Sequence, residues 1–405
     1  MICQPILIFN VMKRSWATAL ILIVTFSAFV LGFTLSYTSL PQPEAEEDYE
    51  RAAIEVMDKL SKLRGLSLPE RFEVKVVSSS WVREHWGKPL TVEEPLEWKI
   101  YKALLFIPTE ASFEEFEEEW AGYIMAASSG ETLYIVRDMV EGVEERVLKR
   151  TLAHESIHIL QYVNFEIVRP GIYDAEQALN ALIEGDADLS ADLFLEAEGL
   201  KPPEKKAPTL RRGDYREALT LIKLFPYHYG KPFTAYLYEH GGWKLLNKAY
   251  EKPPSSTEQV MHPEKYLQGE GFEKPELPAP EEDWRLLGEN RLGEYFIYVF
   301  LARWIGSETA EVASEGWNGD RAAYYEADGD FLLIWATHWD SRGDAEEFHQ
   351  AITMMLTNAG GVEIPENLWK VKDIFIALRA SDGRIKVFSS NNLEALKQVT
   401  SQLET

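Results

Sequence analysis

The sequence contains a single cysteine, Cys3, so neither a disulfide nor a cysteine-ligated zinc site can form within one chain. Basic residues are also scarce, since 41 Lys and Arg stand against 66 Asp and Glu and the formal net charge is −25. A chain of this charge would repel a phosphate polymer, which argues against nucleic acid as a partner. Any metal site must therefore be built from histidine and carboxylate ligands.

Charged residues are absent from Trp16 to Ser36, an apolar run that would be about 31 Å long as a helix and could span a bilayer. Lys13 and Arg14 precede the run, and the next basic residue is Arg51. This asymmetry predicts a single-pass membrane protein with its N-terminus in the cytoplasm and its body outside. A cleaved signal peptide, which would release the body as a secreted protein, is the alternative.

The most informative stretch carries the pattern His-Glu-x-x-His. His154 and His158 are one helical turn apart, so both imidazoles leave the same face of a helix and can bind one Zn²⁺. Glu155 stands beside them, where it can act on a metal-bound water molecule. The surrounding residues are apolar on nearly every side, which predicts a buried helix over about 141–164. Buried imidazoles need partners, so a pair of surface histidines is the weaker interpretation.

A third protein ligand must come from outside this helix. The positions that would supply a glycine and a third histidine in the metzincin pattern hold Gln161 and Asn164. The next segment offers Glu184 and, one turn later, Asp188, and Gly185 between them would let the two helices approach closely. The combination of His-Glu-x-x-His with Glu-x-x-x-Asp resembles the gluzincin metallopeptidases, of the thermolysin-like and peptidase MA-like kind.

This resemblance implies a zinc ion held by His154, His158 and Glu184. Asp188 would then accept the free ring N–H of one histidine. The same resemblance implies a tyrosine after the glutamate ligand, and Tyr227 is the first candidate by motif position for stabilising the oxyanion. Further candidates for contacts with the substrate or the oxyanion are His228, Tyr229, His262 and Tyr266. For His262 the alternative is a hydrogen bond in the core or between domains.

The predicted function is a membrane-anchored zinc endopeptidase that hydrolyses extracytoplasmic polypeptides. Glu155 is expected to take a proton from the attacking water and return it to the leaving amine. No Gly-x-Met-Glu-Asn string is present, which argues against the aminopeptidase relatives that use it. The alternative is a non-catalytic zincin fold that keeps zinc in a binding or scaffold role, although a purely structural site has no need of Glu155.

The predicted fold class is α+β, with a mainly helical, zincin-like catalytic domain that contains a small antiparallel sheet. A hairpin is predicted over residues 122–136. The resemblance to zincins implies that such a strand borders the cleft and pairs with extended substrate, and the alternative is an ordinary sheet with no role in binding. The predicted parts of the chain are a cytoplasmic tail (1–15), a transmembrane anchor or signal peptide (16–37), an acidic linker (38–48), the zinc metallopeptidase domain (49–280) and a C-terminal α+β domain (281–405).

The C-terminal domain shows an apparent duplication. Two ββα units each contain an Asp-Gly turn, at Asp328-Gly329 and at Asp382-Gly383, and each is followed by a helix. We expect the four strands to join one antiparallel sheet with both helices on the same face. An apolar helix over Leu286–Ile305 is predicted in front of these units. The strings 256–266 and 316–321 also resemble uncharacterised prokaryotic proteins that carry the same metal motif.

Overall fold

A computed structural model describes residues 46–86, 94–121, 125–204, 210–280, 283–364 and 367–401. The predicted cytoplasmic tail and the apolar run over 16–37 lie outside these ranges. Within them, no helix is both long enough and apolar enough to cross a membrane. The predicted fold class is therefore corrected to a mixed α and β protein that has no membrane span in its described residues.

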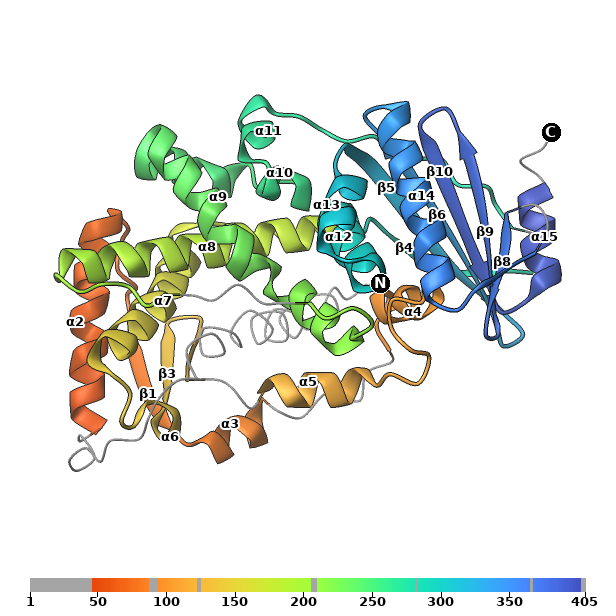
Figure 1. Ribbon diagram of the computed structural model, residues 1–405. Helices are drawn as coiled ribbons and strands as arrows, with labels where there is room; N and C mark the ends of the chain where they lie inside the picture. Colours follow the sequence, from red (N-terminus) through yellow and green to blue (C-terminus); the bar gives the residue numbers. More distant parts are fainter. Residues whose placement is uncertain are drawn as a thin grey trace, which may run out of the picture.

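The helices in chain order are α2 (Glu46–Arg64), α3 (Ser79–His85), α4 (Leu96–Ala103), α5 (Phe113–Ala121), α6 (Arg137–Val140), α7 (Glu145–Asn164), α8 (Tyr173–Ala197), α9 (Tyr215–Glu251), α10 (Thr257–Met261), α11 (Pro263–Gln268), α12 (Gly293–Ile305), α13 (Ser307–Ser314), α14 (Arg342–Asn358) and α15 (Leu393–Ser401). The strands are β1 (Glu73–Val77), β2 (Ala126–Ser129), β3 (Thr132–Val136), β4 (Arg285–Asn290), β5 (Trp317–Ala327), β6 (Asp330–Trp339), β7 (Val362–Ile364), β8 (Leu368–Val371), β9 (Ile374–Ser381) and β10 (Arg384–Ser390). Figure 1 shows α2, α7, β1 and β3 at one end of the molecule and the larger sheet with α14 and α15 at the other.

A small sheet lies beside α7, with the strand order β1-β3-β2. β2 and β3 form an antiparallel hairpin, but β1 runs parallel to β3. The prediction of an antiparallel sheet was therefore wrong, and the sheet is mixed. After β1 the chain passes through α3, α4 and α5 and re-enters the sheet as β2, which runs opposite to β1. The β2–β3 hairpin then reverses the chain, and this places β3 parallel to β1.

α8 occupies the centre of the helical part. On one side, Leu182 packs into a large apolar cluster that extends to Phe300 of α12 and Phe348 of α14. On the other side, Ala187 and Ala191 pack into a smaller cluster formed with α2 and α7. Because both sides of α8 are covered, its polar residues are enclosed by protein.

Two glycines mark the point where α8 and α9 come closest. A Cβ atom added to Gly185 of α8 would lie 2.2 Å from the backbone of Gly230 of α9, and one added to Gly230 would lie 2.3 Å from the carbonyl oxygen of Ala181. Only a residue without a side chain permits this approach. Gly185 was expected to face the histidine helix, whereas its close contact is with α9.

The larger sheet has seven strands in the order β4-β5-β6-β10-β9-β8-β7, and all its neighbours are antiparallel. Its central hairpins, β5–β6 and β9–β10, are those expected from the Asp-Gly turns. Asp328, Gly329, Asp382 and Gly383 all have positive φ angles, as a two-residue type I′ turn requires. β4, β7 and β8 extend the sheet beyond the two predicted units.

α14 and α15 cover opposite faces of this sheet, so the expectation of a shared face was wrong. Trp335 of β6 faces α14, where its ring centroid lies 5.8 Å from that of Phe348. Leu332 and Ile334, which alternate with Trp335, pack with Leu396 of α15. Since both faces of the central strands are apolar, each face needs a helix to cover it.

The helix predicted over Leu286–Ile305 is divided into two elements. Its first residues form β4, which pairs with β5 and has a register shift between Leu286 and Gly288. α12 then begins at Gly293, which has a φ of 82°. A positive φ at this position turns the chain sharply between strand and helix, and glycine adopts it without strain.

A buried carboxylate joins α12 to the central sheet. Asp320 of β5 accepts hydrogen bonds from the backbone N–H groups of Leu292 and Gly293 at 2.9 and 2.8 Å. It also accepts the indole N–H groups of Trp317 and Trp335 at 3.1 and 3.0 Å. Two of these donors lie at the N-terminus of α12, where a negative charge is favourable.

Replacing Asp320 with alanine is expected to lower the free energy of unfolding by about 4 kcal/mol or more, because four buried donors would lose their acceptor at about 1–3 kcal/mol each. Urea denaturation would measure this loss. The exposed Asp373 supplies a control in the same sheet, and Asp373→Ala should change stability by less than about 0.5 kcal/mol. A loss below about 1 kcal/mol for Asp320→Ala would show that Asp320 does not hold this junction.

Candidate metal centre

The His-Glu-x-x-His residues lie on α7, and α8 packs against it with Glu184 and Asp188. His154, Glu155, Glu184 and Asp188 each expose only 1% of their surface, and the side chain of His158 exposes 8%. Removing so many ionisable groups from water is unfavourable unless they are paired or bind a cation. Each of these buried groups must therefore have a hydrogen-bond partner, an ion-pair partner or a bound cation.

Three potential ligand atoms converge at one point between the two helices. His154 Nε2 lies 3.1 Å from His158 Nε2 and 3.2 Å from Glu184 Oε2, and His158 Nε2 lies 3.5 Å from Glu184 Oε2. Ligand atoms at about 2.0–2.2 Å from a tetrahedral Zn²⁺ lie about 3.3–3.6 Å apart. The triangle formed by these three atoms thus has nearly the dimensions of one face of a zinc tetrahedron.

The carboxylate of Glu184 supports the same conclusion. Among the described residues, neither of its oxygens accepts a hydrogen bond of good geometry, although both are buried. Burial lowers the pKa of His154, but the carboxylates of Asp188 and Glu184 outweigh this effect and raise the pKa to about 9. The group therefore attracts positive charge. Two imidazoles and a carboxylate are ligands that Zn²⁺ prefers, so the donor set fits this ion.

Asp188 lies on the far side of the His154 ring from the three converging atoms. Its Oδ1 is 3.2 Å from His154 Nδ1 and 2.8 Å from Arg150 Nη2. Arg150 also donates to Asp192 at 2.6 Å, and Asp192 accepts from Lys231 of α9 at 2.5 Å. Because a carboxylate can only accept here, the neutral His154 ring carries its proton on Nδ1 and leaves the lone pair of Nε2 for a metal ion.

Glu155 is held by the small sheet. The hydroxyl of Ser128 in β2 donates a hydrogen bond of 3.0 Å to Glu155 Oε2. The negative charge of Glu155 is close enough to contribute to the raised pKa values of His158 and Tyr227. The carboxylate therefore lies next to the converging ligand atoms and on the side of the sheet.

Tyr227 reaches the centre from α9. It lies one turn before Gly230, where α9 approaches α8 most closely. Burial, followed by the negative charges of Glu184 and Glu155, raises the pKa of Tyr227 well above its ordinary value. The hydroxyl therefore stays protonated and can act as a hydrogen-bond donor.

The structure does not bring all the other candidates to the centre. His228 follows Tyr227 on α9 and is half-buried. Tyr229 packs against Tyr295 of α12, with ring centroids 5.3 Å apart. His262 pairs with Glu294 of α12 at 3.1 Å, which is the structural alternative considered for it. The hydroxyl of Tyr266 donates to the carbonyl of Lys252 at 2.8 Å. Tyr229, His262 and Tyr266 therefore make structural contacts away from the converging ligand atoms.

A second group of three possible ligands occurs in the described ranges, formed by Glu258, Glu270 and Asp340. The ammonium group of Lys265 already occupies it, at 2.6, 2.9 and 3.6 Å from the three carboxylates. The ammonium group of Lys265 thus already stands where a metal ion would bind, and the group does not call for one.

Comparison with known proteins adds little to this geometry. A family model described as a domain of unknown function (DUF8575) matches residues 284–400, a range that includes the large sheet but not His154, His158 or Glu184. No protein with a curated description matches the sequence. A crystal structure from Chloroflexus aurantiacus, described as "a putative hydrolase with a novel fold", is similar over 64% of this chain and 97% of that chain, with 15% identity and a TM-score of 0.38. A likeness this low carries no argument about function.

Four residues that support the centre were not found from the sequence. Arg150 lies four residues before His154 on α7 and so shares its face, a spacing that could have indicated it. Gln161, three residues after His158, offers a similar local signal, whereas Ser128 and Arg64 give none because their partners are distant in the sequence. Ser128 was interpreted as part of a hairpin turn. Gln161 was considered only because it occupies the position where the metzincin pattern has a glycine.

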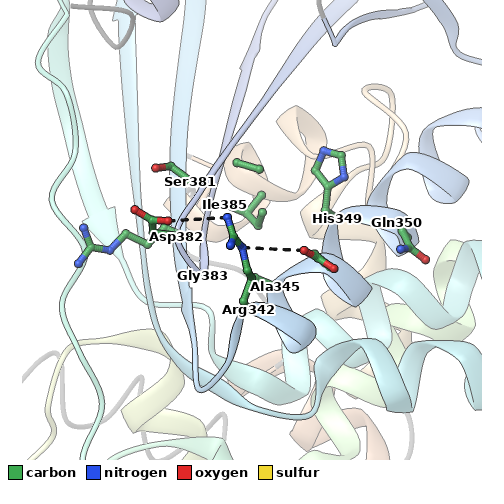
Figure 2. Close-up of a pocket in the computed structure, with 11 residues that line it drawn as sticks. Arg342, Ala345, His349, Gln350, Ser381, Asp382, Gly383 and Ile385 are labelled. Atoms are coloured by element: carbon green, nitrogen blue, oxygen red, sulfur yellow. Dashed lines mark ion pairs between the residues drawn. The ribbon is translucent and has the colours of Figure 1, made fainter.

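A hollow of about 230 Å³ lies elsewhere, between α14 and the β9–β10 turn (Figure 2). Arg342 spans it, with ion pairs of 3.9 Å to Asp382 and 4.0 Å to Glu346. The buried lining residues, Ala345 and Ile385, are apolar, and the charged ones are exposed. Solvent screens such pairs, so the hollow lacks the buried ionisable side chains of the candidate metal centre.

Proposed function

We propose that this protein is a zinc-dependent endopeptidase. The observation that carries the proposal is the convergence of His154 Nε2, His158 Nε2 and Glu184 Oε2 within 3.1–3.5 Å of one another, with Glu155 buried beside them. Three protein ligands leave one position of a tetrahedral site for water or substrate, as catalytic zinc sites require. When bound, zinc would polarise the substrate carbonyl and favour ionisation of a water molecule.

Glu155 is the proposed proton carrier. The oxygen of a water molecule attacks the carbonyl carbon while one of its protons passes to the Glu155 carboxylate, and this proton is then delivered to the leaving nitrogen as the C–N bond breaks. Ser128 orients the carboxylate through its 3.0 Å hydrogen bond. Tyr227, which its raised pKa keeps protonated, is placed to donate its O–H to the oxyanion that develops on the former carbonyl oxygen.

A polypeptide is the proposed substrate because the His-Glu-x-x-His and Glu-x-x-x-Asp pattern resembles that of metallopeptidases. β2 is a terminal strand of the small sheet in the described part of the chain, and Ser128 of β2 contacts Glu155. Ala126, Ala127 and Ser128 expose at most 3% of their surface, so β2 offers no open edge to which a peptide could add.

Glu155→Gln is expected to keep zinc and the fold but to lower the turnover of a labelled casein by at least about 10²-fold, because the amide cannot accept the proton. Zinc content and casein hydrolysis, each with and without a chelator, would measure this. Glu145→Gln is a matched control on α7, since the Glu145 side chain is 75% exposed. Full hydrolysis by Glu155→Gln would refute the mechanism, and zinc binding without any hydrolysis by the wild type would favour a non-catalytic binding module.

A further inference from the structure

Gln161 lies three residues after His158 on α7, and its side chain is directed at the same histidine. Its Oε1 is 2.8 Å from His158 Nδ1, and the residue exposes only 1% of its surface. The contact is on the far side of the imidazole ring from Nε2. Gln161 therefore contacts Nδ1 of His158 in the same way that Asp188 contacts Nδ1 of His154.

The orientation of the Gln161 amide follows from its other partners. Its Nε2 lies 2.9 Å from the backbone carbonyl oxygen of Ile183 and 2.9 Å from the hydroxyl of Tyr250. A carbonyl oxygen has no hydrogen to give, so the group that faces it must be the NH₂ of the amide. The amide oxygen then faces His158, so the neutral ring carries its proton on Nδ1 and leaves the lone pair of Nε2 for the proposed metal ion.

The groups that hold the NH₂ are themselves fixed by a buried ion pair. The Tyr250 hydroxyl donates to Asp186 Oδ2 at 2.8 Å. Arg64, at the end of α2, donates to both oxygens of Asp186 at 3.1 and 2.9 Å, and both side chains are fully buried. A bidentate pair in a dry interior allows little freedom of orientation. The position of Gln161 is thus determined by residues from α2, α8 and α9.

We propose that Gln161 is a positioning residue that sets the tautomer and ring orientation of His158 and thereby the metal affinity of the centre. The proposal rests on the proposed zinc site. Gln161 also ties α7 to the carbonyl of Ile183, which directly precedes Glu184. One side chain therefore controls the placement of two of the three ligand residues relative to each other.

The test is the zinc affinity of Gln161→Leu, in which a side chain of similar size cannot accept the His158 N–H. Competition with a chelating dye should show zinc binding weakened by about 10–100-fold, the usual effect of losing such a contact. The absorption spectrum of the Co²⁺-loaded protein should change as well, since it reports ligand geometry directly. Asn164→Ala is the matched control, because the Asn164 amide lies one turn further along α7 and binds the backbone of Ser67.

Two outcomes would overturn the proposal while leaving the zinc site intact. One is a Gln161→Leu variant that binds zinc within about threefold of the wild type and keeps the same Co²⁺ spectrum. If Gln161→Leu does not fold, Tyr250→Phe is measured instead, because it keeps Gln161 but removes one partner of its NH₂. Zinc binding by Tyr250→Phe as tight as that of the wild type is the second contradicting outcome. Absence of zinc binding by the wild-type protein would instead refute the proposed function, and this inference with it.

Discussion

Glu184→Ala is expected to abolish tight zinc binding and hydrolysis together, whereas Asp188→Ala should weaken either by only about 10–100-fold. The reason is the side of the ring that each carboxylate occupies. Glu184 Oε2 lies 3.2 and 3.5 Å from the Nε2 atoms of His154 and His158, where the metal would bind. Asp188 Oδ1 lies at His154 Nδ1, on the opposite edge of the imidazole. Asp188 therefore orients a ligand and cannot itself be one in this geometry.

Zinc titration of both variants, followed by peptide hydrolysis, would measure the contrast. Glu196→Ala provides a control on α8, because Glu196 is exposed near the end of that helix, and it should behave like the wild type. If Asp188→Ala lost the metal while Glu184→Ala retained it, the ligand assignment would be reversed. The gluzincin-like arrangement would then be refuted.

Gly185→Ala is expected to destabilise the protein by about 3 kcal/mol or more, the upper end of the cost of overpacking. The new methyl group would lie 2.2 Å from backbone atoms of Gly230, which cannot rotate away as a side chain can. Helix propensity alone predicts the opposite sign, since alanine is favoured over glycine in a helix by about 1 kcal/mol. Separating α8 from α9 would also displace Tyr227 from Glu184, so hydrolysis should fall as well.

Thermal or urea unfolding of Gly185→Ala would decide the sign. Gly271→Ala is the matched control: a Cβ atom at Gly271 would meet nothing within 4 Å, and its φ is not in the left-handed region. The control should leave stability and activity unchanged. A Gly185→Ala variant as stable as the wild type would show that α8 and α9 can separate without cost, contrary to the packing described.

The elements that could be predicted from the sequence are those governed by local geometry. His154 and His158 share a face because four residues make about one turn of any α-helix, and the structure has a helix there, from Glu145 to Asn164. The hairpin turns at Asp328-Gly329 and Asp382-Gly383 are likewise local, since the positive φ angles required by the turn select these residues.

Predictions that depended on the assembly of distant segments were less accurate. The small sheet was expected to be antiparallel, but β1 enters it parallel to β3. The helices α14 and α15 were expected on one face, and the apolar residues on both faces of β6 place them on opposite faces. A strand at Arg285–Asn290 was interpreted as helix, because a short apolar run has no distinct periodicity before its pairing partner is known.

The candidate centre shows the same division. By itself, the sequence determined that two imidazoles and a carboxylate share one helix and that Glu184 and Asp188 share another, because these relations depend only on helical periodicity. Only the folded arrangement shows which edge of the His154 imidazole meets Glu184 and which meets Asp188, that Ser128 contacts Glu155, and that α9 reaches the centre through the Gly185–Gly230 contact. These contacts join residues up to tens of positions apart, and they form only when burial of the apolar faces brings the helices together.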